Sequence, residues 1–318
     1  MKFSLRLNND LPVDAYPRLA RAAEEAGFDQ FWVSDDLFLR SAWVILSAVA
    51  QATTRIQIGT CIVNPHTIHP AEMAMAAATL NELAHGRFLL GLSSGADDFL
   101  SWVGIEAERP VRTVRETIDT LRRLWRGEPG GAHGWTDQAY LRFEARPIPI
   151  YIGAMSPRML RLIGEVADGG LPLLFPPEHF AEVMTYIQPR PGVDVAACIW
   201  CSVTRDDRAA AEQVLRDKIA YYGHALSPTI LRRLGLTKED FAPIQQRLQA
   251  GDPEQAASLV TPEMLKIGVV GTAQDLVPRL DTLVELGAQH LSFGPPLGPD
   301  LFVAIEVLGR EVLPRYRQ

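Results

Sequence analysis

The sequence predicts a (β/α)8 TIM barrel that forms one domain over residues 1–318, with an insertion after the seventh strand. Three observations lead to this prediction. Apolar, strand-like runs alternate with helical patterns, eight such runs are each followed by helical material, and the length of 318 residues suits a single α/β barrel. A doubly wound open sheet is the alternative that the same alternation allows.

The boundaries of the expected helices are marked by proline and glycine. Proline loses nothing at the first helical position, where its missing N–H would have no partner, and glycine tolerates the left-handed conformation that ends a helix. The expected strands read KFSLRL, DQFWVS, RIQIGTCIV, RFLLGLSS, PIYIGA, GGLPLLF, VAACIWCSVT and HLSFG. The first six are followed by helices over about residues 13–26, 41–51, 70–84, 110–125, 157–167 and 178–187.

Two segments interrupt this alternation of strands and helices. Residues 127–143 are rich in glycine and end in a short alternating tail, so we expect a surface excursion there that could form a hairpin. Residues from about 222 to 266 contain helical pieces with turns at Ser227-Pro228 and Asp252-Pro253, and we expect a helical insertion. Long insertions in barrels usually lie over the active face, because the site is built from the βα loops.

Composition and charge exclude several classes of function. A net charge of -7 offers no basic excess to replace the counterions of phosphates, so we expect no nucleic-acid partner. The chain has no signal-peptide pattern and no run of eighteen apolar residues, which predicts a cytoplasmic location without a membrane partner. The three cysteines favour a reducing compartment, and Cys198 and Cys201 are expected to point to opposite faces of one buried strand as structural residues.

Small and polar residues follow several expected strands, where the active site of a barrel is built. The turns after two of them, Ser93–Gly95 and Gly153–Ser156, expose backbone N–H groups ahead of a helix, which favours a phosphate. A tight turn that needs glycine explains them equally well. Asp35 and Asp36 end the second strand and point opposite ways, so one would face the barrel while the other caps a helix or faces solvent.

A metal site is not expected. The histidines of NPHTIHP, His66 and His69, have no helix to align them, and no cysteine or carboxylate stands at ligand spacing. We expect one of them to cap or lie in a loop and the other to pack.

Four passages together resemble the luciferase-like superfamily, in its deazaflavin-dependent branch near the methylenetetrahydromethanopterin reductases. They are FWVSDD, GTCIVNPHTIHPAEMA, RFLLGLSSGADDFLSWVGIEAERPV and IYIGAMSPRMLRLIGEVADGG, with FGPPLGPD near the end of the chain. The resemblance implies an oxidoreductase that transfers a hydride between coenzyme F420 and a small imine, alkene or carbonyl substrate. The segments NPHTIHP and FGPPLGPD favour F420, and FMN is the alternative cofactor.

The resemblance also implies which residues bind the cofactor. Its ring would lie at the barrel mouth against a non-proline cis peptide, which falls here on Cys61 and Ile62. The polar side chain and phosphate of the cofactor would be held by Ser93, Ser94, Gly95, Ala96, Gly153, Ala154, Met155 and Ser156. Asp35 is a further candidate for binding the cofactor. Relatives associate through barrel helices, so the resemblance further implies a homodimer.

Three positions depart from the related reductases. Asp36 stands where histidine is frequent, Arg6 where those reductases have glutamate, and Ala96 where they have an acidic residue. These departures argue against a methanopterin substrate. Asp36 is the expected proton-handling group, and Arg6 either anchors the substrate or pairs with a neighbouring carboxylate. A flavin-dependent monooxygenase and a cofactor-binding barrel without catalysis are the competing hypotheses.

Overall fold

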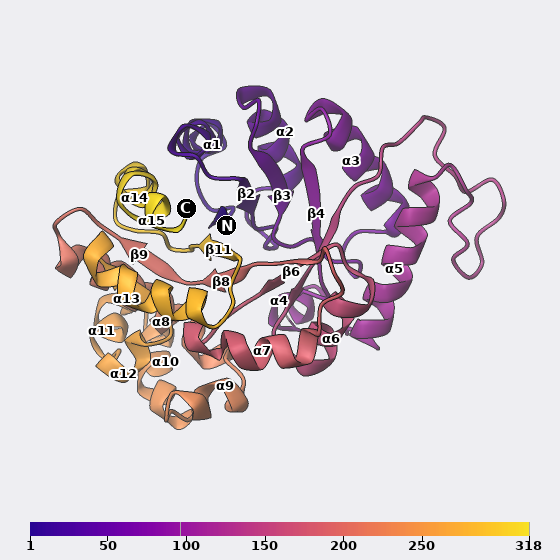
Figure 1. The fold of residues 1–318 in the computed structure, drawn as a ribbon. Helices are drawn as coiled ribbons and strands as arrows, with labels where there is room; N and C mark the ends of the chain where they lie inside the picture. Colours follow the sequence, from indigo (N-terminus) through magenta and orange to yellow (C-terminus); the bar gives the residue numbers. More distant parts are fainter. Residues whose placement is uncertain (96, 318) are drawn as a thin grey trace. The chain divides into compact units, whose positions relative to one another are not determined.

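The structure, a computed structural model, describes residues 1–95 and 97–317 and contains alternating strands and helices (Figure 1). The chain divides into two compact units. The larger unit comprises Ser4–Pro172 and Val183–Ala196, and the smaller unit comprises Met1–Phe3, Leu173–Glu182 and Ala197–Gln318.

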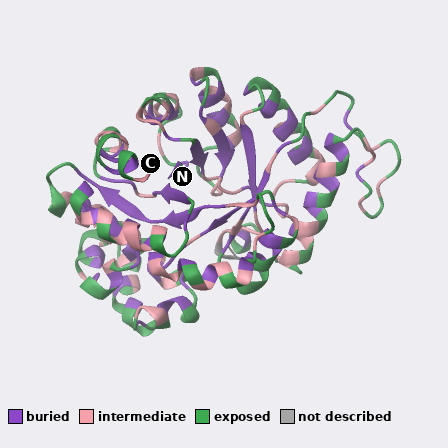
Figure 2. Ribbon diagram, in the orientation of Figure 1, coloured by how far each residue is buried: buried purple, intermediate pink, exposed green. Residues whose placement is uncertain are grey.

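The strands of the larger unit pair in chain order, and each neighbouring pair is parallel. A parallel neighbour needs a crossover connection, which is the βα repeat that the sequence predicts. The strands are almost entirely buried (Figure 2). They are β1 (Lys2–Leu7), β2 (Gln30–Val33), β3 (Gln57–Thr60), β4 (Phe88–Leu92), β5 (Ile150–Ala154), β6 (Gly169–Pro172) and β7 (Asp194–Val195).

The helices begin and end close to the predicted positions. Pro70, Pro110 and Pro157 each occupy a first helical position, and Gly27 ends α1 in the left-handed conformation with φ 90°. Successive helices contact one another from α1 to α3, and α5 contacts both α3 and α6. The helices are α1 (Ala15–Ala26), α2 (Ala42–Ala52), α3 (Pro70–Leu83), α4 (Asp97–Trp102), α5 (Pro110–Trp125), α6 (Pro157–Val166) and α7 (Phe180–Ile187), with the 3-10 turn η1 (Pro177–His179) before α7.

The run VAACIWCSVT is not one strand, so that prediction is wrong. It divides at Trp200 into β8 (Ala197–Ile199) and β9 (Cys201–Val203), because the two halves have different partners. β8 pairs with β11 (His290–Phe293), whereas β9 pairs with β10 (Val269–Gly271), a short strand that the sequence did not suggest. Cys198 and Cys201 are both buried, one on each half.

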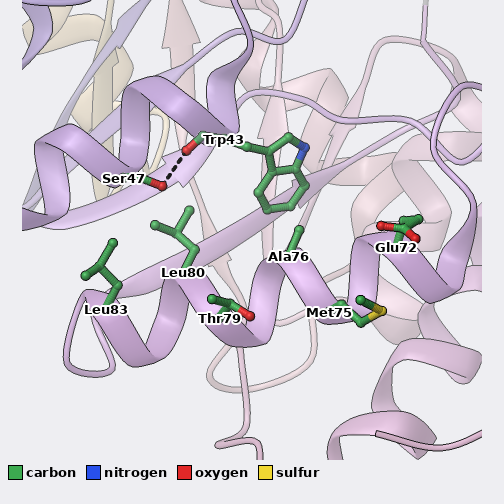
Figure 3. A pocket seen from close by; sticks show the side chains of 8 residues that line it. All are labelled: Trp43, Ser47, Glu72, Met75, Ala76, Thr79, Leu80 and Leu83. Atoms are coloured by element: carbon green, nitrogen blue, oxygen red, sulfur yellow. Dashed lines mark hydrogen bonds between the residues drawn. The ribbon is translucent and has the colours of Figure 1, made fainter.

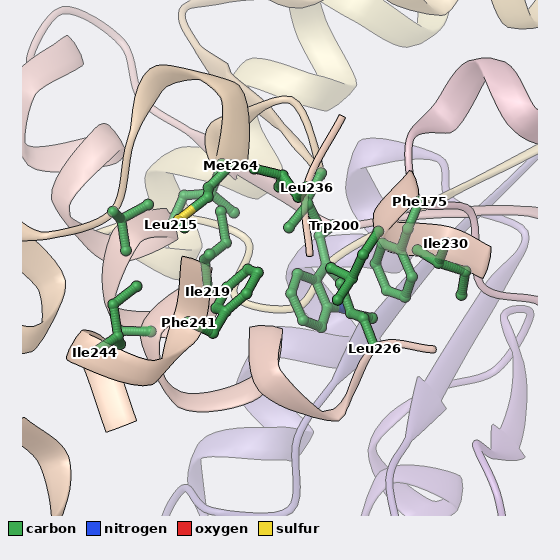
Figure 4. Close-up of a cluster of buried hydrophobic side chains, with 14 of the residues drawn as sticks. Phe175, Trp200, Leu215, Ile219, Leu226, Ile230, Leu236, Phe241, Ile244 and Met264 are labelled. Atoms are coloured by element: carbon green, nitrogen blue, oxygen red, sulfur yellow. The ribbon is translucent and has the colours of Figure 1, made fainter. Parts of the chain in front are cut away.

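The predicted helical insertion is present and has its own apolar core (Figure 4). Its expected turns are helix starts, because Ser227 and Asp252 accept hydrogen bonds from Ile230 N–H and Gln255 N–H. Trp200 and Phe175 both belong to this core, with ring centroids 4.7 Å apart. The helix α8 (Arg208–Tyr222) precedes the insertion. The elements of the insertion are η2 (Gly223–Ala225), α9 (Pro228–Arg233), η3 (Glu239–Phe241), α10 (Ala242–Gln249), α11 (Pro253–Ser258) and α12 (Pro262–Leu265).

The chain ends in further helices. They are α13 (Ala273–Glu285), α14 (Leu301–Val307), η4 (Leu308–Val312) and α15 (Leu313–Tyr316). Of the helices in the described part of the chain, none is both long and apolar enough to cross a membrane.

The excursion over residues 127–143 contains turns, and none of its residues, all of which are described, lies in a strand, so the suggested hairpin is absent. Gly130 N–H donates to the carbonyl oxygen of Ala139 and closes the loop. The ring of Trp135 stacks on that of His69 at 5.4 Å between centroids. The excursion is therefore tied to the start of α3.

Candidate active site

Exposure rises where the strands of the larger unit end. β4 is buried throughout, but Ser93, Ser94 and Gly95 after it are half-buried. At the end of β5, Gly153 is half-buried, whereas Met155 and Ser156 are exposed. Groups at these carboxyl ends can therefore reach a ligand, as expected for a barrel. Ala96, also a predicted site residue, lies outside the described residues.

The segment after β3 meets the ends of β4 and β5. The Cys61–Ile62 peptide bond is cis, as the resemblance implied. Cys61 N–H donates to the carbonyl oxygen of Val33 at 2.7 Å, and Val63 N–H donates to that of Gly91 at 3.0 Å. A Cβ atom added to Gly153 would lie 2.9 Å from Ile62 Cγ2 and 3.7 Å from Ser93 Cβ. Three predicted positions, 62, 93 and 153, are thus brought into contact, and only glycine allows this approach at position 153.

Asn64 joins the segments after β3 and β4, and sequence reasoning did not single it out. Its side chain is 8 % exposed, and its Oδ1 accepts from His66 N–H and Thr67 N–H, both at 3.1 Å. A Cβ atom on Gly95, whose φ is +78°, would approach Asn64 Nδ2 to 3.0 Å. The signal in the sequence was the dipeptide Asn64-Pro65, which is typical of a turn start.

The two adjacent carboxylates differ in their contacts. Asp35 Oδ1 accepts from Ala42 N–H at 3.0 Å and caps α2, while Ser41, the residue at the N-cap, makes no such bond. Burial raises the pKa of Asp35, and the hydrogen bond from Ala42 offsets part of that rise. Asp36 is half-buried. Asp35 is therefore the carboxylate that caps a helix, as one of the two was expected to do, and the orientation of Asp36 toward the barrel stays a prediction.

The segment after β2 is held in place by Asn9, which follows β1. Asn9 Nδ2 donates to the carbonyl oxygens of Asp36 at 3.1 Å and Arg40 at 2.7 Å. In return Arg40 N–H donates to the Asn9 carbonyl oxygen at 3.1 Å, and Arg40 Nη1 donates to that of Asp10 at 2.6 Å. Asn9 is fully buried, and within the described part of the chain its Oδ1 accepts no hydrogen bond. We call Asp36–Arg40 the clamped loop; Asn9 was not among the predicted site residues.

Arg6 lies in β1 in register with Trp32, and only 3 % of it is exposed. A guanidinium stays charged at all ordinary pH values, and its burial is costly unless partners compensate for it. Little of Arg6 can be reached from solvent in this structure. Its proposed role as a substrate anchor stays a prediction.

The remaining predicted polar groups contribute to helix starts. Ser156 Oγ accepts from Met159 N–H at 3.4 Å at the start of α6, directly after Ala154 and Met155. His69 Nδ1 accepts from Ala71 N–H at 3.2 Å at the start of α3, so the expected capping histidine is His69. The described residues contain no group of three or more His, Cys, Asp or Glu placed to hold a metal.

A groove of about 320 Å³ lies on the larger unit between α2 and α3 (Figure 3). Trp43 and Met75 are among its mostly apolar lining, and Glu72 is its one ionisable group. It offers no pair of groups that could exchange a proton. The groove is therefore better suited to packing than to chemistry.

Parallel strands in chain order, with half-buried polar turns at their carboxyl ends, define an α/β-barrel enzyme. The chain belongs to the luciferase-like monooxygenase family, whose family model matches residues 3–290. It is similar over its whole length to the solved structure of the coenzyme F420 dependent tetrahydromethanopterin reductase from Methanopyrus kandleri. The TM-score is 0.93 with 26 % identity, covering 99 % of both chains. This similarity confirms the predicted (β/α)8 TIM-barrel fold.

Relatives with similar sequences align with the chain over almost all of its length. A 5,10-methylenetetrahydromethanopterin reductase of Archaeoglobus fulgidus is 31 % identical and aligns over 100 % of both chains. An F420-dependent glucose-6-phosphate dehydrogenase of Nakamurella multipartita is 30 % identical over 94 % of this chain and 91 % of its own.

Proposed function

We propose that the protein is an F420-dependent oxidoreductase that transfers a hydride between the deazaflavin and a small imine, alkene or carbonyl substrate. The observation that carries this proposal is the similarity over the whole chain, at 30 % identity or more, to relatives named as a reductase and an F420-dependent dehydrogenase. A bound deazaflavin supplies two electrons as a hydride, and the protein positions the reactants and handles the proton.

The strand ends suit such a cofactor. Cys61 and Ile62 are half-buried and present a mostly apolar surface against which a flat ring would lie. The close approach of Ile62 to Gly153 leaves no room for a side chain at position 153, so the contact between these two segments requires glycine there. The polar part of the cofactor would be held by Asp35, Ser93, Ser94, Gly95, Ala96 and the turn Gly153–Ser156. In this proposal Asp35 also caps α2.

Proton transfer falls to Asp36. Its backbone is fixed by Asn9, and its half-buried side chain follows β2 at the edge where the other candidates gather. A carboxyl group held beside the reacting atoms can supply or remove the proton that accompanies a hydride. The fixed charge of Arg6 would orient a polar group of the substrate.

Binding of the cofactor tests the proposal most directly. The purified protein is titrated with oxidised F420 and, separately, with FMN, and binding is followed by calorimetry or fluorescence quenching. Micromolar or tighter binding of F420 with weak binding of FMN is expected. The reverse preference, with oxygen uptake coupled to substrate oxidation, would favour the monooxygenase hypothesis; binding without turnover of any substrate would favour a barrel that has lost catalysis.

The protein further acts as a homodimer in this proposal. Helices α2 and α3 carry apolar residues on their outward face as well as toward the strands, and Val44, Met75 and Leu83 are 60 %, 46 % and 38 % exposed. Helices that are apolar all round are usually buried, so a second copy covering this face accounts for them. A light-scattering mass equal to one chain at every concentration would exclude the dimer.

The proposal extends to the protein's environment, and the thiols and the net charge support this part of it. All three cysteines are thiols, and two of them are buried, which suits a reducing, cytoplasmic location. The net charge of -7 disfavours binding to the phosphates of nucleic acids, so we propose no nucleic-acid partner. Cell fractionation and a filter-binding assay with DNA and RNA test these two points.

A further inference from the structure

Two aromatic side chains of the larger unit are exposed and face each other. Phe38 is 72 % exposed and Trp102 is 59 % exposed, and their ring centroids lie 6.2 Å apart. Phe99 packs against Trp102 at 4.9 Å. Single exposed aromatic residues need no explanation, but rings that meet from separate segments form an apolar patch. We call Phe38, Phe99 and Trp102 the aromatic cluster.

The aromatic cluster lies beside the candidate active site. Phe38 belongs to the clamped loop after β2, two residues beyond Asp36, and the other two rings belong to α4, which follows Ser93–Gly95 after β4. In the sheet, β3 lies between β2 and β4. The segments on either side of Cys61 and Ile62 therefore meet at these rings, at the carboxyl ends of the strands.

The backbone of Phe38 has an unusual conformation. Its φ is 65°, in the left-handed region that a bulky residue seldom adopts. The residues on both sides are fixed, because Asn9 Nδ2 binds the carbonyl oxygens of Asp36 and Arg40. Unusual backbone angles that the surroundings enforce are concentrated at functional sites.

The apolar character of the aromatic cluster and its neighbours indicates which kind of ligand it would bind. Leu39 and Val103, which neighbour Phe38 and Trp102 in sequence, are also exposed, at 48 % and 43 %. Arg40 directs its guanidinium to the Asp10 carbonyl oxygen. Aromatic faces attract flat apolar rings by stacking and offer few hydrogen bonds to a sugar or a phosphate.

We propose that Phe38 and Trp102 form one wall of the substrate site and stack on a flat, apolar ring of the substrate. The inference rests on the proposed function and narrows its substrate class to cyclic, conjugated or aromatic imines, alkenes and carbonyls.

The test measures binding of 2-acetylnaphthalene, an aromatic carbonyl probe, by calorimetry with and without saturating oxidised F420. Phe38→Ala and Trp102→Ala should each raise the Kd of the probe about 2- to 12-fold, the factor expected for one aromatic pair. Trp102→Phe, which keeps a ring, should restore most of the affinity. The Kd for F420 should stay within about 2-fold of wild type.

Phe143→Ala is the matched control, because Phe143 is also exposed, at 41 %, but lies in the excursion. It should leave both Kd values unchanged. The proposal is overturned if the wild-type protein does not bind the probe, if glucose 6-phosphate binds more tightly than the probe, or if neither alanine variant weakens probe binding. Alanine variants that lose only dimerisation would instead identify a subunit contact. Failure of wild type to bind F420 while the probe still binds would count against the proposed function alone.

Discussion

Asp35 and Asp36 are adjacent, yet only Asp35 is committed to a helix start, through Ala42 N–H. Replacing Asp36 by asparagine keeps the shape of the side chain and removes its titration. We expect kcat to fall about 10²- to 10⁴-fold, the usual contribution of a general acid or base, and one limb of the pH profile to disappear. Steady-state kinetics over pH with a reducible substrate measure both. Asp10→Asn is the control, and an unchanged pH profile in Asp36→Asn would refute the assignment.

Asn9 is a second residue to test, because its side-chain amide donates hydrogen bonds to two backbone carbonyl groups. Asn9→Ala leaves those of Asp36 and Arg40 without this donor, so we expect a loss of about 1–3 kcal/mol in the free energy of unfolding. Urea denaturation measures this loss. The control Asn8→Ala removes the same side chain one position earlier and should change stability by less than about 0.5 kcal/mol. Equal losses of stability in the two variants would mean that the hydrogen bonds of Asn9 Nδ2 make no specific contribution to the free energy of unfolding.

At the scale of elements, prolines and glycines in the sequence were sufficient to place most helices. Sequence patterns within one segment did not predict the structure where it depends on partners far away in the chain. The division of VAACIWCSVT at Trp200 depends on β10 and β11, about seventy and ninety residues further on. Asn9 was missed for the same reason, since its partners lie 27 and 31 residues away. The strand-end site was predictable because barrel topology dictates it, whereas the contact of Ile62 with Gly153 depends on packing.

The connection between α2 and β3 is held by Glu24 of α1. Its carboxylate accepts from the backbone N–H groups of Thr54, Arg55 and Ile56 at 3.0, 2.6 and 2.8 Å. Burial alone would raise the pKa of Glu24, but the hydrogen bonds from these N–H groups outweigh it and lower the pKa. A lowered carboxyl pKa means stability that is present above the unfolded value of about 4.3 and is lost as the pH falls.

Glu24→Gln should therefore destabilise the protein by about 1 kcal/mol at pH 7. The difference from wild type should shrink as the pH falls from about 5 to 3, because the wild-type carboxylate becomes protonated. Urea unfolding at several pH values measures it. Glu25→Gln, an exposed neighbour, should differ little from wild type at every pH. A Glu24→Gln effect that does not depend on pH would contradict the charge-based explanation.

At the scale of the whole molecule, neither compact unit is one continuous segment, because the smaller unit contains both chain ends and an internal piece. We propose that residues 1–318 fold as a single domain. Unfolding by urea should give one transition that coincides by far-UV circular dichroism and by tryptophan fluorescence. Two separated transitions would mean that the units are independent domains.

The proposed dimer gives a matched pair of variants. Leu83 at the end of α3 and Leu286 after α13 are 38 % and 37 % exposed. Leu83→Lys places a charge at the apolar face of α2 and α3, and we expect it to halve the mass found by light scattering at micromolar concentration. Leu286→Lys should leave the mass unchanged. Dissociation by both variants, or by neither, would place the interface elsewhere.

The clamp on residues 36–40 also bears on how such an enzyme can evolve. Both of these hydrogen bonds from Asn9 Nδ2 end on main-chain oxygens, so this anchoring does not depend on which side chains occupy positions 37 to 39. Mutations at those positions can accumulate while the barrel keeps its stability. Positions 37 to 39 of the clamped loop can therefore change during evolution, and the enzyme can acquire new substrates while its fold stays the same.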